Sequence, residues 1–172
     1  PYSPAAGTGL SSHELNQPGC YRDVKDTTVV AQFKMLDPKP EMTQHGTPYF
    51  LAWTTTPWTL SSNTALCVGP KIEYVAVQSF NPYTGEPATY VCAKALLNAH
   101  FNPKAADIAF EDYKPGDKLV PFKVVAEYKG TDLVGMKYEQ LLPWITPENA
   151  DQAFRVIPGD YVTTEDGTGI VH

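Results

Sequence analysis

Residues 72–92 read IEYVAVQSFNPYTGEPATYVC, two runs of strand-forming residues on either side of a polar turn. In residues 72–80, apolar and aromatic side chains recur at alternate positions, as in a strand with one buried face. The residues on this face are Ile72, Tyr74, Ala76 and Phe80. Residues 81–86 contain the Asn, Pro and Gly that turns prefer, and residues 89–92 return as a strand. The stretch therefore predicts a β-hairpin.

Further strands are expected on both sides of this hairpin. Residues 27–36 alternate in the same way, and the other candidate strands are short: 49–54, 63–68, 119–128, 154–157, 161–163 and 169–171. Pro121 near the start of one of them indicates an edge strand or a bulge. Helices are expected only at residues 94–101 and 148–153, because 16 prolines and 12 glycines interrupt the chain. The pattern predicts a mainly β fold with a few short helices, an antiparallel barrel or sandwich.

Charge and composition exclude several functional classes. The net charge is −6, and only two of the 13 basic residues are arginine. This argues against an independent nucleic-acid binder, but not against a domain that contacts a short piece of nucleic acid held elsewhere. No apolar run is long enough for a membrane span. The three cysteines form no CxxC pair, so we expect no zinc site, reduced thiols and a cytoplasmic location.

The densest polar segment follows a predicted strand. Residues 53–63, WTTTPWTLSSN, place hydroxyl side chains on both sides of Pro57, which breaks the strand and turns the chain. Hydroxyls and freed backbone amides that converge there suit an uncharged polar ligand, or the developing oxyanion of an ester. The alternative is structural, because threonine favours strands and its hydroxyl can cap its own turn.

A second segment, DGTGIVH at residues 166–172, has two glycines on either side of Thr168. Glycines such as Gly169 would let a ligand approach the backbone closely, and the alternative is a plain glycine turn before a strand. No GxSxG, HExxH or Walker lysine occurs, and no metal site is expected. His13, His45 and His100 are expected to be surface residues.

Together, the two segments resemble the editing insertion of isoleucyl-tRNA synthetases. Residues 53–65, WTTTPWTLSSNTA, are similar to the threonine-rich peptide of that domain, and residues 167–172, GTGIVH, to its second motif. The related valyl and leucyl enzymes usually read Thr-Thr-Arg-Pro where this chain has Thr56, and Ser61 stands where the family commonly has proline. The opening, PYSPAAGTGLSSHEL, looks like the connector from the catalytic domain. The resemblance implies a connector over residues 1–26 and a β-barrel-like editing domain over residues 27–172.

The resemblance also implies a reaction and roles for particular residues. The domain would use water to hydrolyse the ester of mischarged Val-tRNA(Ile) and would exclude isoleucine by size. Thr55 would place the ester and the water, and His172 would border the side-chain pocket. The residues expected to bind substrate are Thr54, Thr56, Trp58, Asn63 and Gly169. Asn63 would support the threonine peptide or contact the terminal adenosine, and Trp58 would lie near the ribose or pack in the core.

The partners implied are the 3′ end of mischarged tRNA(Ile) and the catalytic domain of the parent ligase, which uses ATP and Mg²⁺. The editing domain itself would need no cofactor, and we expect it to be a monomer in isolation. In the family an aspartate beyond the GTGIVH motif holds the α-amino group. Since the chain ends at His172, we expect it to be truncated and a weak deacylase on its own. Two alternatives stay open: a module that only binds aminoacyl-adenosine or the tRNA end, and a purely structural insertion.

Overall fold

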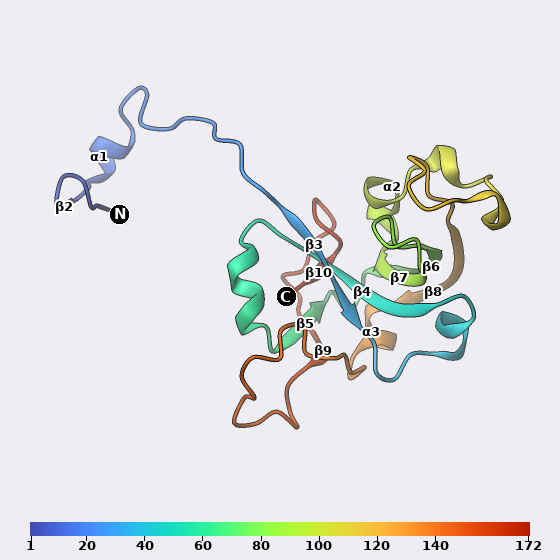
Figure 1. Ribbon diagram of the computed structural model, residues 1–172. Coiled ribbons are helices and arrows are strands. Elements are labelled where there is room, and N and C mark those ends of the chain that lie inside the picture. Colours follow the sequence, from blue (N-terminus) through green and yellow to red (C-terminus); the bar gives the residue numbers. More distant parts are fainter.

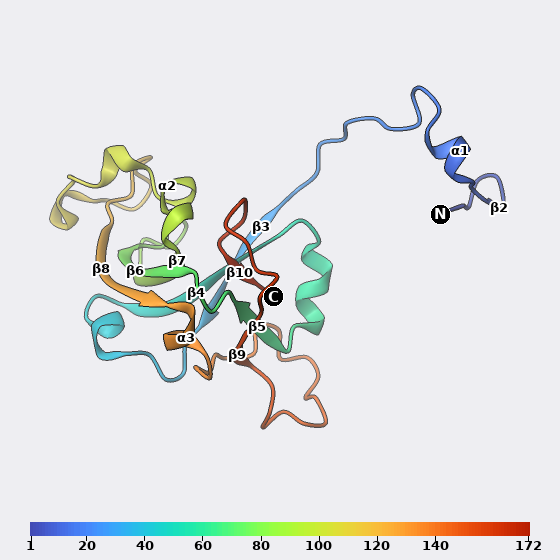
Figure 2. The same ribbon diagram turned by 180° about the vertical axis from the view of Figure 1, so that it is seen from behind.

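The computed structural model describes all 172 residues, and it shows a β-rich body from which residues 1–26 project (Figures 1 and 2). This N-terminal arm contains the strand pair β1 (Tyr2–Ser3) and β2 (Thr8–Gly9) and one helical turn, α1 (Ser12–Leu15). A capping box starts α1: the Ser11 side chain accepts the Glu14 N–H, and Glu14 accepts the Ser11 N–H. No residue of α1 is buried. The connector role of residues 1–26 stays a prediction.

The body is organised around a five-stranded sheet with the order β3-β4-β7-β6-β8. Its strands are β3 (Val29–Lys34), β4 (Thr47–Thr54), β6 (Glu73–Phe80), β7 (Pro87–Ala93) and β8 (Lys123–Lys129). The predicted hairpin is confirmed, since β6 and β7 pair antiparallel from Tyr74↔Ala93 to Phe80↔Pro87. The Asn81 side chain caps the turn by accepting the N–H groups of Tyr83 and Thr84.

A smaller sheet has the order β10-β5-β9. It contains β5 (Ala65–Val68), β9 (Arg155–Pro158) and β10 (Ile170–Val171). The fold is mainly β with short helices, as predicted, but the expectation of antiparallel pairing throughout is wrong. β4 pairs parallel with β7, and β5 pairs parallel with β9. Long connections between these strands permit the parallel pairs, whereas the sequence pattern reports only local alternation.

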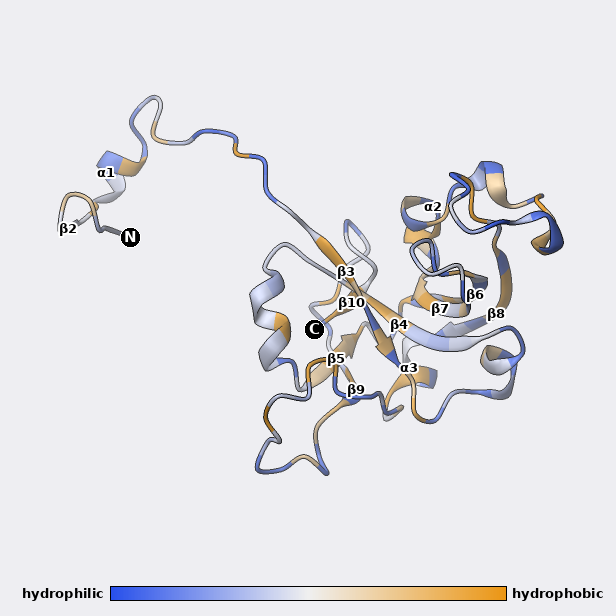
Figure 3. Cartoon of the chain, in the orientation of Figure 1, coloured by the Kyte–Doolittle hydropathy of each residue, from blue (hydrophilic) through white to orange (hydrophobic).

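Both faces of the large sheet are buried. Along β6, Tyr74 and Ala76 belong to one hydrophobic core, and Val75 and Val77 belong to another. The first core also contains Leu66, Val68 and Ile170, so it fills the space between the two sheets. The second core is closed by the segment between β7 and β8. Figure 3 shows hydrophobic colours on the strands and a largely polar arm. The first core thus fixes β10, and with it the GTGIVH motif, against the large sheet.

The helical elements are short, and only η2, with six residues, is longer than about one turn. They are η1 (Pro40–Thr43), η2 (Pro57–Ser62), η3 (Lys94–Leu96), α2 (Leu97–His100), η4 (Pro103–Ala105), η5 (Phe110–Asp112) and α3 (Gly130–Leu133). The predicted helix at residues 94–101 is confirmed as η3 followed by α2. None of these helices has the length and apolar character needed to cross a membrane.

Three local predictions are wrong. Residues 148–153 form turns and not a helix, because only i→i+3 bonds such as Gln152 N–H to Asn149 C=O close there. Residues 161–163 form no strand, since the Val162 N–H bonds back to Gly159 in a turn. The strand expected at residues 119–128 begins only at Lys123, after Pro121, which has no N–H to donate to a sheet.

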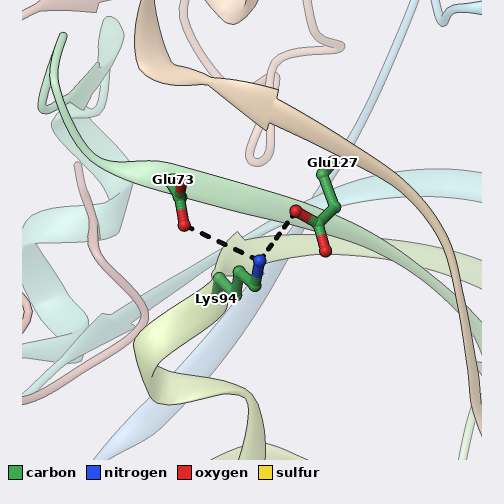
Figure 4. A network of polar contacts seen from close by, with 3 residues as sticks. All are labelled: Glu73, Lys94 and Glu127. Carbon is green, nitrogen blue, oxygen red and sulfur yellow. Dashed lines mark hydrogen bonds and ion pairs between the residues drawn. The ribbon is translucent and has the colours of Figure 1, made fainter.

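A charged cluster joins the large sheet to the segment after β7 (Figure 4). Lys94 Nζ lies 2.7 Å from Glu127 Oε2 and 3.7 Å from Glu73 Oε2, so the cluster links η3 to β8 and β6. Hydrogen bonding to Glu127 raises the pKa of Lys94. All three side chains are largely exposed, so solvent screens their attraction and the cluster adds little to stability.

Candidate functional site

The threonine-rich peptide turns sharply at the end of β4. Thr54 is buried, and its Oγ1 accepts the Thr56 N–H at 3.1 Å. Thr56 precedes Pro57, the first residue of η2, and its carbonyl oxygen accepts the Thr59 hydroxyl at 2.7 Å. Thr56 Oγ1 also lies 3.3 Å from Thr54 Oγ1 and 3.2 Å from Thr59 Oγ1. The hydroxyls therefore do cap their own turn, and they also form a linked group at the strand end.

Two residues of this peptide point to solvent. Thr55 is exposed, and Trp58 on η2 is 68% exposed. The suggestion that Trp58 packs in the core is therefore wrong. Thr54 is the last residue of β4, whereas Thr55 lies in the bend that follows the strand.

Asn63 supports the threonine peptide from inside. Its Nδ2 donates to the Ala65 carbonyl at 2.8 Å, and its Oδ1 accepts the Tyr138 hydroxyl at 2.7 Å. Tyr138 is fully buried, and this burial raises the pKa of its phenol, so the hydroxyl stays a donor. Since both polar atoms of Asn63 are engaged within the chain, the structure supports the first of its two predicted roles. No local sequence pattern pointed to Tyr138.

The GTGIVH motif is anchored through its backbone. Gly169 has φ +72°, and a Cβ built on it would lie 2.4 Å from the Cβ of Ala93. The Ala93 N–H donates to the Thr168 carbonyl at 2.8 Å, and the Tyr74 hydroxyl donates to the Gly169 carbonyl at 2.7 Å. The glycine is thus required for close approach to β7, and the open ligand surface expected at Gly169 is occupied by the protein itself.

The two motifs meet at one cleft of about 540 Å³. Three of the predicted site residues line it: Thr56, Asn63 and His172. The others (Thr54, Thr55, Trp58 and Gly169) do not. The further lining residues are Thr59, Ser62, Thr64, Ala65, Cys67, Ile157, Tyr161 and Val171. None of the lining side chains is an Asp, Glu, Lys or Arg, so the cleft presents hydroxyl, amide and apolar groups.

Sequence reasoning missed the far wall of the cleft. Cys67 is buried on β5, and Tyr161 lies against it in the turn after β9. Gly159 makes this contact possible, because a Cβ there would lie 2.7 Å from Cys67 Sγ and 2.9 Å from Tyr161 Cε1. Only the pairing of β5 with β9 and β10 brings these residues to the threonine peptide, and this pairing has no local sequence signal. No group of three or more His, Cys, Asp or Glu side chains is placed to hold a metal ion.

His172 is expected to titrate below an ordinary histidine. Partial burial at the cleft lowers its pKa from 6.5, because desolvation disfavours the imidazolium. In the unfolded chain the His172 imidazole has the higher pKa and binds its proton more readily. The free energy of unfolding therefore increases as pH rises from the lowered pKa to 6.5. An NMR titration of the imidazole resonances, with His172→Gln to assign the signal, should give a midpoint under 6.5. A midpoint above it would show that the ring is solvated or charge-paired.

Comparison with known proteins gives matches over the whole chain. The chain is 83% identical over 172 residues to the isoleucine–tRNA ligase of Bacteroides fragilis, 69% identical over 173 residues to that of Porphyromonas gingivalis and 41% identical over 172 residues to that of Clostridium tetani. The chain is a segment of the isoleucine–tRNA ligase family. It spans 15% of the length of the first two relatives and 13% of the third. No protein-family model matches it.

Solved structures give the fold of this segment. The chain matches the editing domain of the Plasmodium knowlesi cytosolic leucyl-tRNA synthetase with a TM-score of 0.57 and 15% identity, over 84% of this chain and 57% of that one. It matches the Plasmodium falciparum editing domain with a TM-score of 0.53 and 16% identity, over 74% and 41%. The expectation of an editing-domain fold is thereby confirmed.

Proposed function

We propose that the chain is the post-transfer editing domain of an isoleucine–tRNA ligase and hydrolyses the ester of Val-tRNA(Ile). The observation that carries this proposal is the single uncharged cleft at which the threonine peptide and the GTGIVH motif meet. An aminoacyl ester is neutral at its reacting carbonyl, and hydroxyl and amide groups can hold it without a counter-ion.

Water is the nucleophile in this proposal. Its oxygen attacks the ester carbonyl, the bond to the ribose oxygen breaks, and the proton passes to that oxygen, leaving valine and free tRNA. No Asp, Glu, Lys or Arg lines the cleft, and the one imidazole there, His172, forms no hydrogen bond to a threonine hydroxyl that would activate it for attack. The linked hydroxyls of Thr54, Thr56 and Thr59 hold the peptide in its turn, and they orient Thr56 toward the substrate. The exposed hydroxyl of Thr55 is free to place the ester at the rim.

The apolar part of the cleft serves selection by size. Ile157, Val171 and the neutral ring of His172 line it. A single pocket separates ligands that differ by one methylene by only about 1–3 kcal/mol, and isoleucine against valine is the established example. A second, smaller pocket that admits valine and excludes isoleucine corrects this. Ligation with ATP and Mg²⁺ belongs, in this proposal, to the catalytic domain that delivers the tRNA end.

The experiment is misacylation by the full-length ligase. Thr55→Ala and Thr56→Arg variants are incubated with valine, ATP and tRNA(Ile), and the accumulated Val-tRNA is measured. We expect Thr56→Arg to slow deacylation roughly 10-fold or more, because it removes an oriented hydroxyl donor, as in other acyl-transfer sites. Its charged side chain would also fill the cleft. Thr84→Ala, in the turn between β6 and β7, is the matched control and should edit as the wild type does.

Two outcomes would contradict the proposal. If Thr56→Arg accumulates no Val-tRNA, the threonines serve only as strand-end caps. If the wild-type enzyme binds Val-tRNA(Ile) but releases no valine, the domain is a binding module, which is the second candidate function. Pre-formed Val-tRNA, assayed without ATP, separates this result from a failure of ligation.

A further inference from the structure

His100, at the end of α2, contacts the GTGIVH motif directly. Its Nε2 lies 2.7 Å from the carbonyl oxygen of Gly167. Because a carbonyl oxygen can only accept, Nε2 must carry the hydrogen of this bond. The expectation that His100 is a simple surface residue is therefore wrong: a histidine 67 positions earlier in the chain holds the first residue of the motif.

Gly167 is one of the points at which the two motifs approach each other. Its φ is +68°, and a Cβ built on it would lie 3.3 Å from Cε3 of Trp53. Trp53 directly precedes Thr54, the buried start of the threonine peptide. The orientation of the Gly167 carbonyl therefore sets how the loop before β10 lies against β4.

Three successive carbonyls of this loop accept hydrogen bonds from three different elements. Gly167 accepts from His100 on α2, Thr168 accepts from the Ala93 N–H on β7, and Gly169 accepts from the Tyr74 hydroxyl on β6. Two of the three residues are glycines in the left-handed region, which have many other conformations open to them. Each bond removes some of that freedom, so the loop leads into His172 with one geometry.

The His100 ring is not a core-filling group. It is half-buried, and it also lines a separate cavity of about 600 Å³. Replacing it would therefore remove the bond to Gly167 without emptying a packed core. In contrast, His45 makes a similar bond to the Ser79 carbonyl at 2.9 Å but packs between Phe80 and Phe110, away from the cleft.

We propose that His100 is a positioning residue for the editing reaction: its Nε2–H fixes the Gly167 carbonyl, and through it the placement of His172 against the threonine peptide. The inference rests on the proposed editing function. His100 touches no substrate in this scheme. Its loss should misplace the reacting groups without removing any of them, and rates are sensitive to such misplacement.

The test uses the full-length ligase with His100→Leu, His100→Gln and the control His45→Leu. Deacylation of Val-tRNA(Ile) by His100→Leu should show kcat lowered about 10-fold, with KM changed by less than about 2-fold. His100→Gln keeps an N–H donor at nearly the same reach and should recover most of kcat. His45→Leu should leave both constants unchanged. Hydrogen exchange of the peptide that contains residues 166–172 should be faster in His100→Leu only.

The outcomes separate this inference from the proposed function. If the wild-type enzyme is active and His100→Leu is unaffected, the positioning role is overturned and the proposed function stands. Equal impairment of His100→Leu and His100→Gln would also overturn the positioning role, because it would indicate that the ring acts by packing. An inactive wild-type enzyme overturns the proposed function. Even then, unchanged hydrogen exchange over residues 166–172 in His100→Leu would refute the positioning role.

Discussion

Gly169→Ala should destabilise the chain by about 3 kcal/mol, the sum of a strained backbone and an overpacked contact. The φ of +72° costs any residue with a Cβ, and the new methyl group would lie 2.4 Å from the Cβ of Ala93. Neither Ala93 nor Gly169 can move easily to relieve this contact. Ala93 is buried in β7, and the Gly169 carbonyl is bonded to Tyr74. Urea unfolding followed by tryptophan fluorescence measures the loss.

Gly135→Ala is the matched control for the backbone contribution. Gly135 also has a left-handed φ, +88°, but nothing lies within 4 Å of the Cβ it would gain. We expect it to cost about 1 kcal/mol, the conformational part alone. The difference between the two variants is the cost of the contact with Ala93. Equal losses of stability in both variants would mean that β10 can move away from β7 freely, and that contact with Ala93 does not hold the GTGIVH motif.

The strands could be predicted wherever their signal is local. Alternation identified β3 and the hairpin of β6 and β7, because side chains two apart share a face whatever the rest of the chain does. The parallel pairs β4·β7 and β5·β9 could not be predicted in this way, since each joins segments separated by long connections. Residues 161–163 show the opposite error: they are β-formers held in a turn, because tertiary contacts override a weak local preference.

The candidate site shows the same difference between residues with a local sequence signal and residues without one. Residue types and the resemblance pointed to Thr56, Asn63 and His172, and the structure brings these three to one cleft. The neighbours that hold them in place could not be read from the sequence. Tyr138 bonds to Asn63 from 75 positions away, and Tyr74 bonds to Gly169 from 95 positions away. Buried hydroxyls of this kind look like ordinary core aromatics in sequence, and only their partners distinguish them.

Tyr74→Phe should destabilise the chain by about 2–4 kcal/mol, although it keeps the whole ring. The Tyr74 hydroxyl accepts the Gly69 N–H at 2.9 Å and donates to the Gly169 carbonyl at 2.7 Å. Both backbone groups lie in the buried core, where no water can replace the lost partner. Burial also raises the pKa of Tyr74 to about 12, so the hydroxyl is a neutral donor at every pH at which the chain would be studied.

Tyr90→Phe on the neighbouring strand β7 is the control that isolates this effect. Tyr90 is equally enclosed, at 4% exposed, but its hydroxyl forms no hydrogen bond, although the Gln32 side chain lies nearby. Removing an unsatisfied buried hydroxyl leaves no group without a partner, so we expect a change under about 1 kcal/mol, or a gain in stability. Urea unfolding of the two variants side by side gives the comparison. If Tyr74→Phe is no more destabilising than Tyr90→Phe, the bridge from Gly69 to Gly169 does not hold the GTGIVH loop. Positioning of that loop would then fall to Ala93 and His100 alone.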